Sequence, residues 1–139
     1  MAYGFNDDKS KINISQTAYT DMITLDGSNA NFSIAHSALA VQGSVAYINV
    51  ILKVKSATTA NQNYVVPIKL PNNLKLLRVF AITDQAISSN DYRFRGGVIS
   101  GRKSSNTTLP NKDTITFATT EGLPKDTEFE ILGVVMLQG

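Results

Sequence analysis

Apolar and polar side chains alternate along residues 46–54 more regularly than anywhere else in the chain. A period of two places alternate residues on opposite sides of an extended strand, whereas a helix would scatter the apolar positions around its axis. The pattern therefore predicts a strand with one face on a hydrophobic core. The apolar positions on that face are Ala46, Ile48, Val50, Leu52 and Val54.

Shorter apolar runs, separated by turn residues, continue along the rest of the chain. Asp26 and Gly27 form a dipeptide that favours a hairpin turn. Gly96 and Gly97 predict a bulge or bend inside a strand. Pro67 predicts a sheet edge or a bulge, because proline cannot donate to a strand ladder. The further strands are expected at residues 22–25, 32–39, 64–71, 74–83, 92–100, 115–117 and 129–137.

These strands and turns predict an all-β fold, an antiparallel β-sandwich of jelly-roll-like type, over residues 21–139. Residues 1–20 are polar and form either an extended arm that attaches to a partner or a frayed terminus. The last strand, residues 129–137, is apolar at nearly every position. We expect it to be buried on both faces, within the domain or against another subunit.

The composition narrows the classes of function. The chain has 139 residues, of which 42% are hydrophobic and 17% charged, as expected for one folded domain. A net charge of +2 does not predict the clustered basic face with which proteins bind nucleic acid. No stretch is apolar enough to span a membrane. The polar N-terminus predicts no secretory signal. Without cysteine, disulfides and thiolate chemistry are excluded, which fits synthesis in a reducing cytoplasm.

Residues that could perform catalysis are few, and we expect no enzyme, no cofactor and no metal site. The one histidine, His36, shares a face with Phe32 and Ile34 by alternation, so we expect it to pack rather than to act as a base. Glu128 and Glu130 lie two residues apart on one strand. They could form a glycosidase pair, although a solvated strand face is the better interpretation.

A candidate ligand site lies in the segment from Asp91 to Lys103. Alternation places Tyr92 on one face of the expected strand and both Arg93 and Arg95 on the other, with Arg102 following nearby. Guanidinium groups offer several fixed donors to a carboxylate, a phosphate or sugar hydroxyls. The alternative is that these arginines pair with acidic residues of a neighbouring strand.

Two stretches resemble structural proteins of bacteriophages. The opening Ala2-Tyr-Gly-Phe-Asn-Asp-Asp-Lys-Ser-Lys11 looks like the start of small virion proteins of phages and prophages of Gram-positive bacteria. Residues 45–137 resemble the head domain of tail-fibre and baseplate receptor-binding proteins. The resemblance rests on the alternating strand, a strand ending in Leu70-Pro71, a strand over residues 77–82, and the apolar final strand.

The resemblance implies a virion protein, made in the host cytoplasm, that assembles as a homotrimer. Residues 1–20 would attach it to other virion proteins, and the head would bind a cell-surface polysaccharide. Two alternatives stay open. One is a free-standing carbohydrate-binding or adhesin-like sandwich that stacks sugars on Tyr47, Tyr64 or Tyr92. The other is a polymer hydrolase using the two glutamates.

Overall fold

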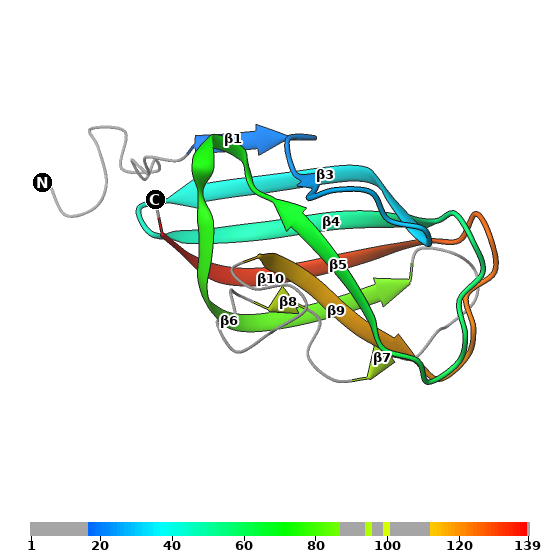
Figure 1. Cartoon of the computed structure of the whole chain (residues 1–139). Coiled ribbons are helices and arrows are strands. Elements are labelled where there is room, and N and C mark those ends of the chain that lie inside the picture. The colour runs from blue at the N-terminus through cyan, green and yellow to red at the C-terminus, as the bar shows by residue number, and fades with distance from the viewer. Residues whose placement is uncertain (1–16, 87–93, 96–98, 101–111, 139) are drawn as a thin grey trace, which may run out of the picture.

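A computed structural model describes residues 17–86, 94–95, 99–100 and 112–138 of the chain (Figure 1). The described residues form strands joined by turns and a single 3₁₀ turn, η1, at Pro71–Asn73. None of their helical segments is long and apolar enough to cross a membrane. The strands are β1 Thr17–Thr20, β2 Thr24–Leu25, β3 Phe32–Gln42, β4 Val45–Val54, β5 Tyr64–Lys69, β6 Lys75–Ala86, β7 Phe94–Arg95, β8 Ile99–Ser100, β9 Asp113–Thr119 and β10 Glu128–Gln138.

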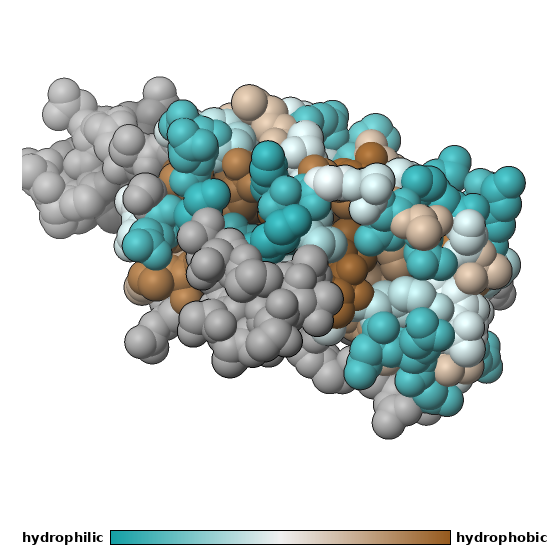
Figure 2. All heavy atoms as spheres, viewed as in Figure 1, coloured by the Kyte–Doolittle hydropathy of each residue, from teal (hydrophilic) through white to brown (hydrophobic). Residues whose placement is uncertain are grey.

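The strands form two antiparallel sheets. Sheet 1 has the order β1-β3-β4-β10-β6, and sheet 2 has the order β2-β5-β9-β7, with β8 also paired to β9. Figure 1 shows β5 and β9 crossing in front of the long strands of sheet 1. Figure 2, viewed from the same side, shows hydrophilic residues over much of the drawn surface, with hydrophobic residues visible between them. The predicted all-β sandwich is therefore confirmed.

The path of the chain explains the jelly-roll-like character. From β4 the chain crosses to β5 in the other sheet, and it later returns through β9 to β10. Since β4 pairs with β10 and β5 pairs with β9, the outgoing and returning segments run side by side across both sheets. This wrapped pair of antiparallel segments is the arrangement found in jelly rolls.

The core lies between the two sheets and is centred on aromatic rings. The ring of Phe117 on β9 lies 5.2 Å from that of Phe32 on β3 and 5.1 Å from that of Phe129 on β10, all in edge-to-face orientation. Such pairs are more favourable than their buried area alone suggests. Alternation on β4 is as predicted, because its five even-numbered residues from Ala46 to Val54 are all fully buried.

The prediction that His36 packs in the core is wrong. Ile34 pairs with Leu52 while His36 pairs with Ile51, so Ala35 is an extra residue in β3. This bulge exchanges the two faces of the strand beyond it. His36 consequently points to solvent, and Ser37 becomes the buried residue.

The predictions for the Asp26-Gly27 turn and for Pro67 also need correction. Gly27 has the positive φ, +99°, of a turn residue, but β2 pairs with β5 in sheet 2, so the Asp26-Gly27 turn closes no hairpin. Pro67 lies within β5, which has β2 on one side and β9 on the other. The Pro67 carbonyl accepts the Asp26 N–H. The Pro67 nitrogen, which has no hydrogen to donate, points to the same side, towards the short β2, and the pairing of β2 with β5 ends at this position.

The ends of the predicted strands differ from the observed ones by up to three residues, and two places bear on the predicted arm and on the predicted ligand segment. Residues 17–20, the last four of the predicted arm, form β1 and pair with β3. Arg95 pairs with Ala118 and Ile99 with Ile115, so the register on β9 shifts by one residue between β7 and β8. This shift is what the bulge expected at Gly96-Gly97 would produce, although the two glycines lie outside the described residues.

Candidate functional site

The ligand site proposed from the sequence falls mostly beyond the described part of the chain. Tyr92, Arg93 and Arg102 lie outside the described residues, and for Arg95 only the main chain is described. That main chain belongs to β7 and pairs with Ala118 of β9. Recognition of a ligand by these residues therefore remains a prediction.

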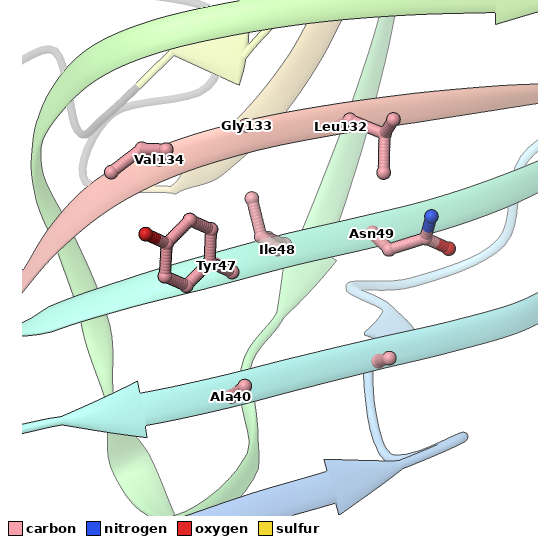
Figure 3. Close-up of a pocket in the computed structure, with 8 residues that line it drawn as sticks. Ala40, Tyr47, Ile48, Asn49, Leu132, Gly133 and Val134 are labelled. Atoms are coloured by element: carbon pink, nitrogen blue, oxygen red, sulfur yellow. The ribbon is translucent and has the colours of Figure 1, made fainter. Parts of the chain in front are cut away.

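An apolar hollow of about 340 Å³ lies on the outer face of sheet 1, opposite the face that covers the core (Figure 3). Three adjacent strands contribute to it, and none of its lining residues is charged. Figure 3 shows Tyr47 and Val134 at one end and Asn49 and Leu132 at the other. The lining residues are Ala38, Ala40, Tyr47, Ile48, Asn49, Leu132, Gly133 and Val134.

Strand register explains why the surface is hollowed here. Tyr47 on β4 lies between Ala40 on β3 and Val134 on β10. In the next outward-facing row, Asn49 on β4 lies between Ala38 and Leu132. The two alanines are too short to fill the space beside β4. Ile48 points into the core, and Gly133 alternates with outward-facing residues, so both contribute main chain to the floor.

Tyr47 is the large side chain that rises beside the hollow. It lies on β4, the central strand of sheet 1, and is 64% exposed. Tyr64 differs, because its ring packs edge-to-face on Phe32 at 5.6 Å and its hydroxyl oxygen accepts the Thr59 N–H at 2.7 Å. Of the three tyrosines considered for stacking, Tyr47 is the one whose ring the structure shows to be open to a partner; Tyr92 is not described.

Polar residues border the hollow at one end. The Asn49 side-chain amide donates to Glu130 Oε2 at 2.9 Å, which fixes the carboxylate beside β4. One row further, Glu128 and Lys53 are direct cross-strand neighbours. Opposite charges at such positions attract each other modestly. Glu128 and Glu130 thus lie on the outer strand face predicted for them, each half-buried and beside a polar neighbour.

A second hollow, of about 330 Å³, lies beside the bulge in β3. His36 Nδ1 is 3.5 Å from Asp21 Oδ1, and both side chains are largely exposed. Asp21 Oδ1 also accepts the Ser37 N–H at 2.9 Å. The Ser37 hydroxyl is buried and accepts the Ile23 N–H, so it stabilises the main chain rather than facing His36 as a nucleophile.

The chemistry of these two hollows differs. Within the described residues no three His, Cys, Asp or Glu side chains come close enough to hold a metal ion. The first hollow offers apolar contact around an aromatic ring, whereas the second offers an exposed imidazole–carboxylate pair. Comparison with known proteins adds no candidate, because no family model, curated protein or solved structure matches the chain.

Sequence reasoning missed the hollow on sheet 1. The doubly apolar pattern of the last strand was the available signal, and it led to the expectation of a second buried face. The position of the hollow depends on register between β4 and β10, which are distant in sequence. A single sequence carries no direct record of that register.

Proposed function

We propose that this chain is a structural protein of a bacteriophage particle, of the tail-fibre, baseplate or head-fibre type, and that it assembles as a homotrimer. Residues 1–16 attach it to other virion proteins, and the assembled head binds a saccharide of the host surface. The chain works by association and performs no catalysis.

One observation carries the proposal: the outer face of sheet 1 has an apolar patch across β3, β4 and β10, in addition to the core face of the sheet. Tyr47 is exposed there, and Leu132, Val134 and Met136 of β10 are only half-buried. Exposed apolar patches in soluble proteins mark sites of association. Oligomers bury such faces between copies, which suits a particle component built from repeated subunits.

The fold agrees with the phage resemblance without depending on it. A jelly-roll-like sandwich preceded by a polar segment is what the resemblance to tail-fibre and baseplate heads implies. β1 is an edge strand of sheet 1 and starts at Thr17, so residues 1–16 join the sandwich at the side of this sheet.

The mass of the full chain in solution tests this proposal. Light scattering coupled to size-exclusion chromatography should give a mass near three times 15.1 kDa. A monomer at micromolar concentration would contradict the proposed assembly. A further check is mass spectrometry of purified phage particles from a host that encodes the chain, which should detect the protein in the particle.

The alternative is a free-standing carbohydrate-binding or adhesin-like sandwich, and the open ring of Tyr47 favours it. An aromatic ring can stack on a pyranose, and Asn49 with Glu130 could accept or donate hydrogen bonds beside it. This alternative predicts a monomer whose glycan binding is lost in Tyr47→Ala and kept in Tyr64→Phe. Wild-type protein that binds no glycan would remove it.

A further inference from the structure

We propose that the hollow on sheet 1 receives Tyr47 of a second copy of this chain, so that the copies associate by insertion of this side chain. The inference rests on the proposed function, because it names the surface and the anchor residue through which the subunits assemble.

The protruding element is Tyr47. It is 64% exposed on the central strand of the sheet, where a partner surface would have its centre. Tyrosine is enriched among residues that dominate binding energy, and these cluster in the middle of interfaces. Its hydroxyl can stay hydrated at the rim of the hollow while the ring is buried.

The receiving element is the hollow beside it. Its volume of about 340 Å³ leaves room for a phenol ring. The short side chains of Ala38 and Ala40 open it, and Leu132 and Val134 provide an apolar wall. A wholly uncharged lining suits an aromatic side chain better than a sugar, whose hydroxyls would lose their hydrogen bonds to water.

Both elements lie on one face, which is the reason to infer a second copy of the same chain. A surface that carries both a protrusion and a hollow can bind a second copy of itself through these two elements. Two copies that insert Tyr47 into each other form a pair about a twofold axis, whereas copies that each insert Tyr47 into the next one close as a ring about a threefold axis. The proposed trimer corresponds to the ring.

The size of the face is sufficient for a stable contact. With strands about 4.8 Å apart and a rise of about 3.3 Å per residue, the four long strands β3, β4, β10 and β6 cover roughly 700 Å². That is about the area that each partner buries in a standard specific interface. The apolar rows around Tyr47 form its centre.

The charges described on three strands of this face do not oppose association. On the described strands β3, β4 and β10, the outward acidic and basic residues lie towards one end, where Glu128 neighbours Lys53 and Glu130 is held by Asn49. Opposite charges are thus matched within each copy. An apolar centre with polar residues at its margin is the usual anatomy of an interface.

The test compares the association of full-length wild-type protein with that of Tyr47→Thr and Ala40→Phe by sedimentation equilibrium. Threonine keeps a strong strand preference, so the fold should persist, and circular dichroism checks this. Tyr47→Thr should weaken association by at least about thirtyfold, as truncation of a dominant interface residue does. Ala40→Phe should also weaken it, because the added ring fills the hollow.

Val65→Thr is the matched control, since it removes an exposed apolar side chain from β5 of sheet 2, and it should leave association unchanged. Stronger association in Ala40→Phe would indicate unspecific apolar contact and would overturn the proposed insertion of Tyr47. An oligomer whose association is unaffected by Tyr47→Thr would also overturn the insertion, but it would not contradict the proposed function. A monomeric wild type would overturn both, whereas a dimer sensitive to Tyr47→Thr would support the insertion and contradict the trimer.

Discussion

The two faces of strand β10 both carry apolar residues but have different surroundings, and the outer face also carries Glu128 and Glu130. Phe129, Ile131, Val135 and Leu137 face the core and are nearly inaccessible to solvent. The apolar residues between them on the other face are half-buried. Both faces would be called buried from composition alone. An apolar pattern on both faces of a strand therefore predicts that both faces contact other residues. The tertiary arrangement decides which of the two faces the same chain covers.

The covered face has its partner within the same chain. Residues of β5 and β9 in sheet 2 lie over it, and the ring of Phe117 closes the space between Phe32 and Phe129. Over the outer face, by contrast, the described strands of sheet 2 contribute nothing, because they lie on the core side. The proposed association would cover this outer face with a second copy of the chain.

The largest effect is expected from Phe117→Ala on the covered side. Phe117 is fully buried and contacts three other rings, those of Phe32, Tyr64 and Phe129. Removing it leaves a cavity that the two sheets cannot close, so the free energy of unfolding should fall by about 3–5 kcal/mol. Urea denaturation followed by circular dichroism measures this, and Phe117→Leu should cost clearly less. An equal loss in both would show that the cavity is not the cause.

Neighbouring residues on β10 sharpen the comparison between its faces. Ile131 is fully buried, and Ile131→Ala should lower the free energy of unfolding by about 2–5 kcal/mol. Leu132 lies next to it on the outer face, so Leu132→Ala should cost less than about 1 kcal/mol in a dilute, dissociated sample. At higher concentration Leu132→Ala should weaken association. Equal losses of stability in the two dilute variants would mean that the outer face is covered by the chain itself.

Much of the fold follows from local patterning. The alternation over residues 46–54 predicted β4 and its core face correctly. Only an extended strand places residues with a period of two on a single face. The doubly apolar run predicted β10. Turn residues separated the strands nearly where the structure separates them. These features are encoded in adjacent residues, which is why one sequence suffices for them.

What failed depends on pairing between distant segments. His36 was misplaced because the extra residue Ala35 is recognisable only against the register of β4. The Asp26-Gly27 turn was identified, but the sheet that receives β2 was not. The hollow beside Tyr47 requires the register of both β3 and β10 on β4. No local pattern of hydrophobicity contains such information.

A smaller effect is expected where the chain passes from sheet 1 towards β2. The buried Ser37 hydroxyl accepts the Ile23 N–H at 3.1 Å, so Ser37→Ala leaves a buried donor unpaired. The free energy of unfolding should fall by about 1–3 kcal/mol. Ser33→Ala, also on β3 but on its outer side, is the control and should change little. Equal stability of Ser37→Ala and wild type would mean that water replaces the hydroxyl.

The smallest effect tests the exposed side of the bulge. His36 Nδ1 lies 3.5 Å from Asp21 Oδ1, and the two side chains are 69% and 55% exposed. Ion pairs this exposed contribute little to the free energy of unfolding. His36→Ala should therefore change the free energy of unfolding by less than about 0.5 kcal/mol. Asp21→Ala should cost more, because Asp21 Oδ1 also accepts the Ser37 N–H. If His36→Ala were as destabilising as a core substitution, His36 would have to face inward, and the register shift at Ala35 would be wrong.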